Sequence, residues 1–492
     1  MAVHSKRFLA IDLGASNGRG LMANFDGERL TLNEIYRFDN RPSQVGKHLY
    51  WDALWLWEHI KKALVKATAV ADGPIISLAV DSWGVDFALL DKSGNLLSNP
   101  YCYRDPQTQN IYDQIFQRVA KEKIFAIAGL QFMNTNSLAQ LAAIQESGSP
   151  PLACAATFLH IADLFTYWLT GTAVSEYTMA STSQLLDARE RRWSTALIRD
   201  MGLPAAIFPP LVTPGTVLGS IQPALVRELG VDNVSVTATA SHDTASAVAA
   251  VPAEGSNFAY ISSGTWALLG TELDQPLLDD RAFAHNLANE GGVFHTIRLL
   301  RNIANMWFLQ ECRNHWAALG SSYSWSELLT LATQEAPFRA FINPDDPAFF
   351  APGDMPSRIR HYCQATDQAV PETDGAVVRI ILESLAFRYR EVLEEVEVVV
   401  GHRLSPLHIV SGGSRNRLLN QFAANATSRP VIAGPHEATA IGNIMMQLVA
   451  SGDLATLDEA RSLVARSFPV ETFLPQESDR WDEEYHGYLT VR

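Results

Sequence analysis

Cysteine is scarce in this chain, and no two cysteines have the spacing of a metal site. Among 492 residues there are four, at Cys102, Cys154, Cys312 and Cys363. Because none belongs to a C-x-x-C pair, the sequence favours neither a zinc site nor a dense disulfide framework. We therefore expect reduced thiols in a cytosolic protein.

Long apolar runs are lacking as well. The run that follows Lys6 and Arg7 ends at Ile11, because Asp12 interrupts it, and it is too short for a signal peptide. No stretch approaches the roughly 20 apolar residues that cross a bilayer. These features predict a soluble, cytoplasmic protein that does not act at a membrane.

Positive charge is in deficit. The chain has 38 Lys and Arg against 53 Asp and Glu, a formal net charge of −15. An acidic balance argues against nucleic acid or an anionic membrane as a partner. Any phosphate would instead be bound by backbone amides, a metal ion and a few placed cations. The length predicts two or three domains.

A glycine-containing turn between two apolar runs is the first positive signal. One run ends at Asp12, small residues follow from Gly14 to Gly18, and the next run starts at Leu21. This pattern predicts strand, tight turn, strand. Backbone N–H groups in such a turn can approach a phosphate closely, and Asp12 could hold a hydrated Mg2+ ion. A Walker A loop does not fit, because the turn has no lysine, and an ordinary hairpin turn is the alternative.

Polar residues also gather near the next predicted strand. Residues 75–80 are expected to form a buried strand that continues through 87–90, with the polar segment Asp81–Asp86 between them. In Tyr101–Asp105, the charged residues Arg104 and Asp105 stand beside aromatic residues, a combination typical of a site that binds sugar hydroxyls. A surface ion pair would give the same pattern.

Helices are expected on both sides of this strand. Asp52 is a candidate N-cap, and apolar residues recur at helical spacing after it, namely Leu54, Trp57, Ile60, Leu64 and Val65. Residues 111–170 are expected to be largely helical, with a last helix that Gly171 closes.

A His-Asp-Thr triplet stands where a strand pattern gives way to a helix pattern. Residues 234–241 alternate like a strand, His242, Asp243 and Thr244 follow, and an alanine-rich segment runs to Val251. A strand-to-helix junction places side chains at the lip of a cleft near the positive end of the helix dipole. Alternatively, Asp243 or Thr244 only caps the helix.

The opening pattern then recurs. Residues 257–270 again predict strand, hydroxylated glycine turn and strand, and a further strand is expected at 293–300. The rest of this half is expected to contain helices at 302–313, 377–398, from 416 and from 437, and strands at 407–413 and 431–433. We predict an α/β fold of two domains, 1–245 and 246–492, that share a duplicated βββαβαβα plan around a central cleft. The turns at 12–19 and 262–265 would bind the phosphates of a nucleotide from two sides, and the turn at Ser411–Gly413 would approach the adenosine.

The residues resemble the FGGY carbohydrate kinases, which have the actin-like ATPase fold built from two ribonuclease-H-like domains. Six segments are similar to the rhamnulokinase branch of that family, namely Asp12–Arg19, Asp81–Phe87, Tyr103–Asp105, Ser241–Ser246, Ser262–Trp266 and Asn289–Gly292. The resemblance covers essentially the whole chain. It implies transfer of the γ-phosphoryl group of ATP to O1 of L-rhamnulose, a step of L-rhamnose breakdown, with Mg2+.

The resemblance also implies roles for individual residues. Asp243 would be the proton acceptor and Asp12 the metal ligand. The sugar would be bound by Gly84, Asp86, Arg104, His242, Asp243, Thr244 and Asn302. The nucleotide would be bound by Ala15, Ser16, Asn17, Gly18, Arg19, Thr265, Gln310 and Gly412. This chain has Ser411 where the related turn often has a third glycine, and Asn17 where serine is frequent, and we expect both differences to have small effects on affinity.

Two other functions stay open at this point. A kinase for another ketose, such as L-fuculose, would differ only in the hydroxyl configurations that its pocket accepts. A non-catalytic actin-like nucleotide-binding protein would keep the phosphate turns but would have no use for Trp83, Arg104 and the His242–Asp243 pair. The expected partners are ATP and a small ketose, without nucleic acid, in a monomer or a homodimer.

Overall fold

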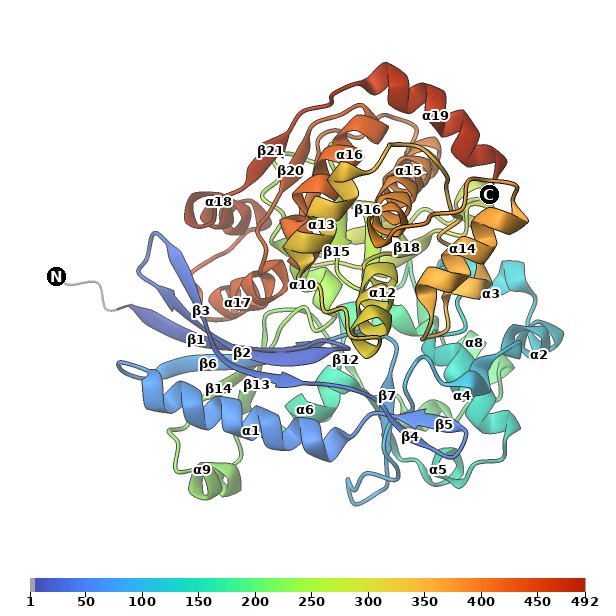
Figure 1. The fold of residues 1–492 in the computed structure, drawn as a ribbon. Helices are drawn as coiled ribbons and strands as arrows, with labels where there is room; N and C mark the ends of the chain where they lie inside the picture. Colours follow the sequence, from blue (N-terminus) through green and yellow to red (C-terminus); the bar gives the residue numbers. More distant parts are fainter. Residues whose placement is uncertain (1–4, 492) are drawn as a thin grey trace. The chain divides into compact units, whose positions relative to one another are not determined.

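The computed structural model describes residues 5–491, which form two compact units (Figure 1). The first unit runs to Glu254 and also includes Glu272–Leu299 and Ala438–Phe468, and the second comprises Gly255–Thr271, Leu300–Glu437 and the described residues from Pro469. The sequence suggested a continuous division after residue 245, whereas both compact units are discontinuous along the chain. No helix among residues 5–491 is both long and apolar enough to cross a membrane.

A six-stranded sheet forms the centre of the first unit. Its order is β13 (Thr216–Ser220), β14 (Ser235–Ala238), β6 (Ile75–Ser82), β1 (Lys6–Leu13), β2 (Asn17–Phe25) and β3 (Leu30–Asp39). Strands β1 and β2 pair antiparallel, which confirms the predicted hairpin, and β6 pairs parallel with both β1 and β14. The hairpin needs glycine at position 18, because a Cβ there would lie 2.1 Å from the ring of Phe38.

Helices cover both faces of this sheet. Helix α1 (Ala53–Val70) packs on β1, β2 and β3, and α17 (Ala438–Ala450) packs on β1, β6 and β14, on the opposite side (Figure 1). The Asp52 side chain accepts a hydrogen bond from the Trp55 amide at 2.9 Å, so the predicted N-cap is confirmed.

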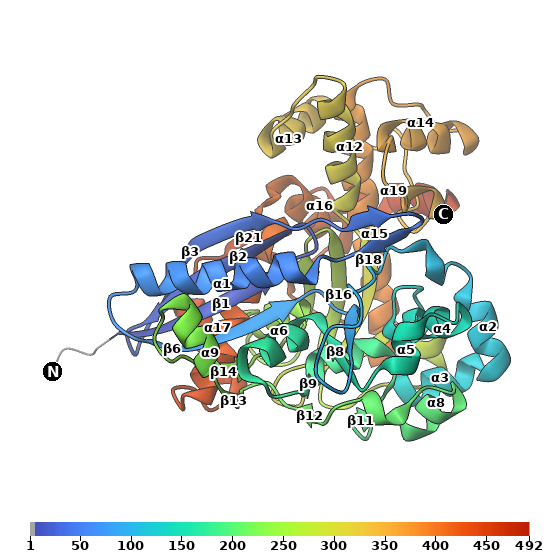
Figure 2. The ribbon, with the colours of Figure 1, turned by 90° about the horizontal axis from the view of Figure 1, so that it is seen from below.

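The buried face of α1 only partly coincides with the apolar positions noted in the sequence. Leu54 and Val65 are 61% and 40% exposed, and the buried residues are Ala53, Leu56, His59, Ile60, Ala63, Leu64 and Ala67. Figure 2 shows α1 lying lengthwise against the sheet, where this set of residues meets the strands. The apolar residues on the outer side of the helix made the periodicity ambiguous.

Strand β7 (Phe87–Leu90) does not continue β6, contrary to the prediction. It pairs antiparallel with β8 (Thr157–His160) in a separate ribbon. The chain turns between the two strands because Val85 has a φ of 69°, and its amide is held by the Thr182 hydroxyl at 3.1 Å. Asp81 and Ser82 therefore end β6, and the chain turns away from this sheet at residues 83–86.

The helical segment after β7 is confirmed. It contains α2 (Ile111–Arg118), α3 (Lys121–Ala128), α4 (Ser137–Glu146), α5 (Pro150–Cys154) and α6 (Ile161–Thr170), and Gly171 closes α6 in the left-handed conformation. The smaller elements of the first unit are β4 (Ser43–Val45), β5 (His48–Tyr50), β9 (Ser175–Glu176), α7 (Tyr177–Ala180), β10 (Leu186–Asp187), β11 (Arg192–Trp193), α8 (Thr195–Asp200), β12 (Leu211–Val212), α9 (Pro223–Leu229), α10 (Asp243–Ala249), α11 (Asp280–Ala284) and α18 (Leu457–Ser467).

The second sheet repeats the plan of the first. Its order is β17 (Ala288–Gly291), β18 (Ile297–Ala304), β16 (Trp266–Leu273), β15 (Ala259–Ser263), β19 (Leu407–Val410), β20 (Val431–Ala433) and β21 (Glu471–Phe473), of which β17 belongs to the first unit. As in the first sheet, an antiparallel hairpin, β15–β16, is followed by a parallel neighbour, β19. The duplicated plan is thus confirmed.

The second unit contains six α-helices among the described residues. They are α12 (Trp307–Ala318), α13 (Trp325–Gln334), α14 (Met355–Ala365), α15 (Asp374–Val400), α16 (Arg417–Thr427) and α19 (Ser478–Thr490). Helices α15 and α16 start close to predicted positions, whereas α13, α14 and α19 were not predicted. The helix predicted from residue 302 begins at Trp307 instead. The strand predicted at 293–300 runs at 297–304, because Phe294 and His295 have φ values of 49° and 66° and form a turn first. Asn302 therefore lies on β18.

Helices α10 and α17 of the first unit touch at a glycine. A Cβ at Gly442 would lie 1.8 Å from the carbonyl oxygen of Ser246. We expect Gly442→Ala to lower the free energy of unfolding by about 1–3 kcal/mol, because forcing a methyl group into packed backbone causes strain. Urea denaturation measures this change.

Gly487→Ala is the matched control in helix α19. A Cβ there would meet the Phe341 ring at an ordinary 3.6 Å. Since alanine favours a helix over glycine by up to about 1 kcal/mol, this variant should be as stable as the parent or more so. Equal stability of the two variants would contradict the close packing of α10 on α17.

Candidate active site

The turn between β1 and β2 is held by hydrogen bonds of its own backbone and of Asn40. The Gly14 amide donates to the Asn17 carbonyl at 2.9 Å. Asn40, which is buried, donates from its side chain to the Gly14 carbonyl at 2.8 Å and from its amide to the Ser16 carbonyl at 3.1 Å. Ala15 and Ser16 thus form the tip of a braced turn. The role of Asn40 was missed, because it lies 24 residues beyond Ser16 in the sequence with no pattern around it.

Arg19 and Asp12 form an ion pair at the base of this turn. They face each other in the register of the β1–β2 hairpin, and Arg19 Nη2 contacts Asp12 Oδ2. Asn17 is held in turn by Arg37, whose Nη1 donates to its Oδ1 at 2.9 Å. A metal ion at Asp12 and phosphate binding by Arg19 would therefore require the two side chains to exchange partners.

Asp81 adds a second buried carboxylate at the same edge of the sheet. It lies opposite Asp12 in the parallel β1–β6 register, and its Oδ2 accepts a hydrogen bond from Asn443 at 2.6 Å. Burial raises the pKa of Asp81 well above its usual value, and the charges of Asp12 and Asp243 raise it further. These three carboxylates are close enough to influence one another.

The donor set fits Mg2+ bound through water. Mg2+ prefers carboxylate oxygens and usually keeps several waters. Across residues 5–491 no group of three His, Cys, Asp or Glu side chains is arranged to ligate a metal ion directly. Asp12, with Asp81 beside it, could hold a hydrated ion, and Mg2+ at Asp12 stays a prediction.

Asp243 is the first residue of α10. Its Oδ1 accepts a hydrogen bond from the Thr244 amide at 2.6 Å and from the Thr244 hydroxyl at 3.2 Å. Burial raises the pKa of Asp243, and the charge of Asp12 adds to this shift. The side chain is still 31% exposed, so a substrate could reach it.

Gly84 and His242 lie beside this carboxylate. The backbone of Ser82 donates to Ser241 O at 2.9 Å, which joins the end of β6 to the loop before α10. A Cβ at Gly84 would lie 3.2 Å from His242 Nε2, and that nitrogen is 3.4 Å from Asp243 Oδ1. The structure therefore brings together Gly84, His242, Asp243 and Thr244, four of the predicted sugar-site residues.

Asp86 has a different environment. It is fully buried and accepts hydrogen bonds from Trp51 Nε1 at 2.6 Å, Gln140 Nε2 at 2.8 Å, Trp83 Nε1 at 2.9 Å and the Tyr103 amide at 3.1 Å. Burial raises the pKa of Asp86 to about 7 against the effect of these bonds. The carboxylate fixes the two indoles, whereas direct sugar binding by Asp86 stays a prediction. Arg104 lies over the Tyr103 ring at 5.3 Å from its centre.

Glu176 was not predicted from the sequence, although it accepts hydrogen bonds that hold the loop just before Asp243. It is fully buried, and its Oε2 accepts hydrogen bonds from the amides of Met179 at 3.1 Å and Ser241 at 3.0 Å. Burial raises the pKa of Glu176 to about 7. Nothing in the local sequence distinguishes it from a surface glutamate, because its partner at 241 is 65 residues away.

In the second unit, Asn305 braces the turn between β15 and β16. Its side chain donates to Ser263 Oγ at 2.9 Å and to the Gly264 carbonyl at 3.1 Å, and it accepts from the Tyr389 hydroxyl at 2.6 Å. Its amide donates to the Thr265 carbonyl at 3.3 Å. Asn305 thus has the bracing role that Asn40 has in the first unit, and it too was missed.

The third turn packs directly on this one. A Cβ at Gly413 would lie 1.9 Å from Ser263 Oγ, so the two turns touch. Gly412 begins a 3-10 turn that ends at Arg415, and the helix proper starts only after Asn416. Ser411 has φ 67° and ψ −169°, a backbone conformation that costs a non-glycine residue about 1–3 kcal/mol. Ser411, which stands where the related turn often has a third glycine, is therefore a strained residue.

The two remaining predicted residues lie elsewhere in the second unit. Asn302 is on β18, and Gln310 is on α12, where its side chain donates to Asn314 at 3.0 Å. Their contacts with sugar and nucleotide stay predictions.

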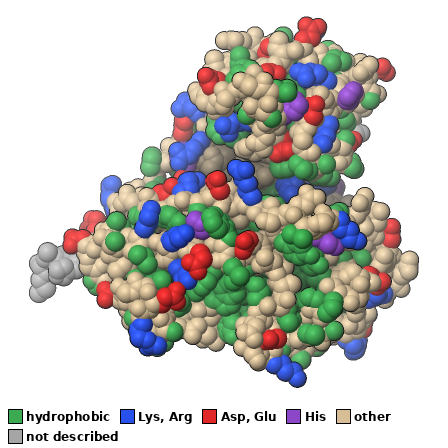
Figure 3. All heavy atoms as spheres, turned by 60° about the horizontal axis from the view of Figure 1, so that its bottom comes forward, with side chains coloured by type: hydrophobic (Ala, Val, Ile, Leu, Met, Phe, Trp, Pro, Cys, Tyr) green, Lys and Arg blue, Asp and Glu red, His purple; other side chains and the backbone are tan. Residues whose placement is uncertain are grey.

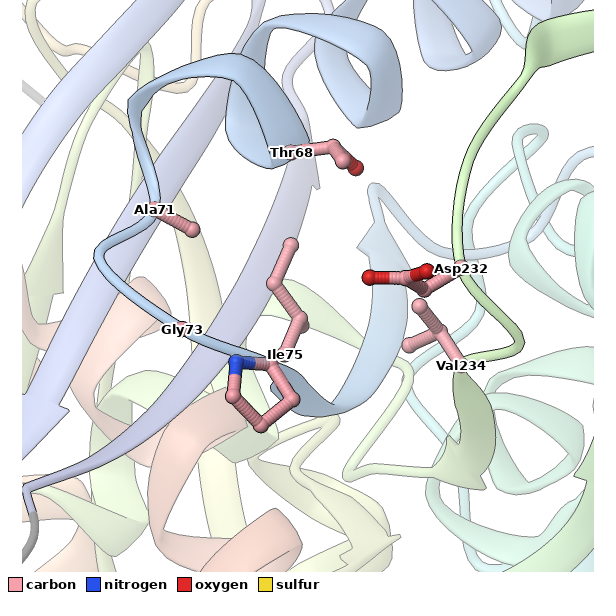
Figure 4. A pocket seen from close by; sticks show the side chains of 7 residues that line it. Thr68, Ala71, Gly73, Ile75, Asp232 and Val234 are labelled. Carbon is pink, nitrogen blue, oxygen red and sulfur yellow. The ribbon is translucent and has the colours of Figure 1, made fainter.

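A surface pocket of the first unit lies apart from these residues (Figure 4). It is lined by Thr68, Ala71, Gly73, Pro74, Ile75, Asp232 and Val234. Ile75 begins β6, whereas Asp81 lies near its other end, about 20 Å along the strand. The pocket is thus at the wrong edge of the sheet to share the chemistry of Asp243.

Comparisons with known proteins cover nearly the whole chain. Residues 7–250 match the N-terminal domain, and residues 259–451 the C-terminal domain, of the FGGY family of carbohydrate kinases. A rhamnulokinase of Bacteroides thetaiotaomicron is 45% identical over 480 residues, which are 98% of this chain and 98% of the relative. A rhamnulokinase of Enterococcus faecalis is 39% identical over 474 residues, 96% of this chain and 94% of the relative.

Solved structures show the same fold at low sequence identity. A xylulose kinase from Lactobacillus acidophilus superposes with a TM-score of 0.81 at 16% identity, covering 99% of this chain and 98% of that one. Plasmodium falciparum glycerol kinase with ADP has a TM-score of 0.77 at 15% identity, with the same coverage. On the family domains and the full-length relatives together, the chain belongs to the FGGY family of carbohydrate kinases, which are phosphotransferases.

Proposed function

We propose that the protein transfers the γ-phosphoryl group of ATP to O1 of L-rhamnulose, giving L-rhamnulose 1-phosphate in L-rhamnose catabolism. The observation that carries this proposal is the position of Asp243, a partly exposed carboxylate beside His242 and Gly84 at the end of a strand. The full-length similarity to proteins named rhamnulokinase supports the choice of sugar.

Asp243 acts as the proton acceptor in this proposal. Phosphoryl transfer has a loose transition state, so the protein mainly aligns the hydroxyl and stabilises charge. The Thr244 amide and hydroxyl hold one oxygen of the Asp243 carboxylate, and the carboxylate can orient the sugar hydroxyl and take its proton late in the reaction. Gly84 leaves room for the sugar, and His242 and Thr244 complete its binding.

The nucleotide is bound chiefly through its phosphates in this proposal. Residues of the first turn, Ala15 to Arg19, approach the phosphates through backbone N–H groups, and Thr265, Gln310 and Gly412 also contact ATP. Asp12 would hold Mg2+, and the bound ion would supply positive charge beside the phosphate oxygens. Arg19 can compensate Asp12 before the nucleotide arrives, since the two side chains are paired.

A coupled assay of ADP release over a panel of ketoses tests the function. We expect the highest kcat/KM with L-rhamnulose. A higher kcat/KM with L-fuculose would identify L-fuculose as the substrate instead. ADP release that no sugar stimulates would favour the non-catalytic actin-like alternative.

Nucleic acid is disfavoured as a partner by the net charge of −15. Figure 3 shows acidic and basic side chains intermixed on the face it presents.

Asp243→Asn should lose most of the kinase activity and keep its affinity for ATP. An amide cannot accept the proton, and such assistance is worth about 10²- to 10⁴-fold in rate. Since burial raises the pKa of Asp243, wild-type activity should fall with decreasing pH at a higher pH than an ordinary aspartate would cause. Steady-state kinetics and calorimetric ATP titration measure both effects. Asp232→Asn, in the distant pocket, is the control, and near wild-type turnover of Asp243→Asn would remove the proposed role.

Asp86→Asn should lower the free energy of unfolding by about 1–3 kcal/mol at low pH, because the amide places two N–H groups among the surrounding hydrogen-bond donors, where a protonated carboxyl places one O–H. The folded-state pKa of Asp86 is raised from 3.8 to about 7, so the bound proton stabilises the fold at low pH and this contribution is lost as the pH rises toward 7. The gap between wild type and variant should therefore shrink from low to neutral pH.

Chemical denaturation at several pH values measures that gap. Asp72→Asn is the control, since the Asp72 side chain is fully exposed. A pH-independent gap, or one no larger than that of the control, would contradict the account of Asp86.

A further inference from the structure

A buried chain of charged groups approaches His242 from the side opposite Asp243. Glu290 is on β17, Arg298 is on β18, and both lie in the first unit with His242. Arg298 is fully buried and Glu290 is 6% exposed. The segment Asn289–Gly292 carries part of the family resemblance, but neither Glu290 nor Arg298 has a role in the proposed function.

The Arg298 guanidinium is fixed from two directions. Its Nη2 donates to Glu290 Oε2 at 2.9 Å, and its Nε donates to the Gly291 carbonyl at 2.9 Å. Burial raises the pKa of Glu290, but the charge of Arg298 beside it opposes burial, and the pKa lies below its ordinary value. Glu290 is therefore a carboxylate, and it compensates the buried positive charge.

Arg298 also sets which nitrogen of His242 carries the proton. Arg298 Nη2 donates to His242 Nδ1 at 3.1 Å. A guanidinium has only donors, so Nδ1 must be the acceptor and must lack a proton. The neutral imidazole then carries its proton on Nε2.

Glu290 alone would favour the opposite arrangement. Its Oε2 lies 3.3 Å from His242 Nδ1 and could accept a proton from that nitrogen. The same oxygen already accepts from Arg298 at the shorter distance of 2.9 Å, and a proton on Nδ1 would point at the Arg298 N–H. Arg298 therefore determines whether neutral His242 carries its proton on Nδ1 or on Nε2, since the other groups would permit either.

The protonated nitrogen is the one that faces the sugar site. His242 Nε2 is 3.4 Å from Asp243 Oδ1, and a Cβ at Gly84 would approach it to 3.2 Å. We propose that Arg298 and Glu290 are positioning residues that keep the proton of neutral His242 on Nε2, so that this N–H donates to a sugar oxygen adjacent to the hydroxyl that Asp243 deprotonates. This inference rests on the proposed function for the identity of the acceptor, but the position of the proton is independent of it.

Nuclear magnetic resonance with nitrogen-15-labelled histidine tests the position of the proton directly. The wild-type signal of His242, assigned by comparison with His242→Gln, should show a protonated Nε2 and an unprotonated Nδ1. In Arg298→Met, where Glu290 stays as an acceptor, the proton should move to Nδ1 or both nitrogens should be protonated. Arg298→Lys keeps a donor-only cation and should restore the wild-type signal.

Kinetics provide the second readout. Loss of one hydrogen bond from Nε2 should raise the KM for the sugar by about tenfold in Arg298→Met, with the KM for ATP unchanged. Arg461→Met is the matched control, because Arg461 forms another buried ion pair of the first unit, with Glu272. It should lose stability while the sugar KM and the His242 signal stay as in the wild type.

Three results would overturn the inference. The first is a wild-type signal that shows the His242 proton on Nδ1. The second is a folded Arg298→Met variant whose His242 signal and sugar KM are unchanged. The third is an equal effect of Arg298→Met and Arg461→Met on the sugar KM. If Arg298→Met does not fold, the wild-type and Arg298→Lys spectra still decide. A wild-type enzyme whose ADP release no sugar stimulates would defeat the proposed function instead, and the spectra would still report the position of the proton.

Discussion

The parallel pairing of β6 with β1 and β14 is the constraint on which the first unit depends. Carboxyl ends of parallel strands meet at one edge of a sheet, and here they carry Asp12, Asp81 and the His242–Asp243 pair. Carboxylates placed so closely need compensation, which Arg19, Asn443 and the Thr244 amide supply. Burial, with a further contribution from the neighbouring carboxylates, raises the pKa values of Asp81 and Asp243 and makes this edge chemically distinct from the rest of the molecule.

Local patterns in the sequence predicted the elements whose cause is local. The β1–β2 and β15–β16 hairpins follow from small residues between apolar runs, and the end of α6 follows from a glycine that accepts a left-handed backbone. The prediction that β7 continues β6 was wrong, because a single positive φ at Val85 redirects the chain and valine gives no sign of it. The helix predicted at residue 302 was wrong for the same kind of reason, a turn at Phe294 and His295 that moved the following strand.

Residues that brace the candidate site could not be found in this way. Asn40, Glu176, Asn305 and Arg298 each act on a partner that is distant in the chain or set by packing, and an isolated asparagine or glutamate has no distinguishing neighbourhood. Gly84, His242, Asp243 and Thr244 were predicted from a family resemblance, and the structure brings them together. The fold and the family could thus be predicted from sequence patterns, whereas the hydrogen bonds that hold the site are visible only in the three-dimensional structure.

The central claim is that this site directs the γ-phosphoryl group of ATP to O1 of a ketose. Phosphorus NMR of the product formed from ATP and L-rhamnulose labelled with carbon-13 at C1 tests it most directly. The account predicts one sugar phosphate whose phosphorus signal is coupled to the labelled carbon. Inorganic phosphate without a sugar phosphate, or a phosphate on another carbon, would contradict it.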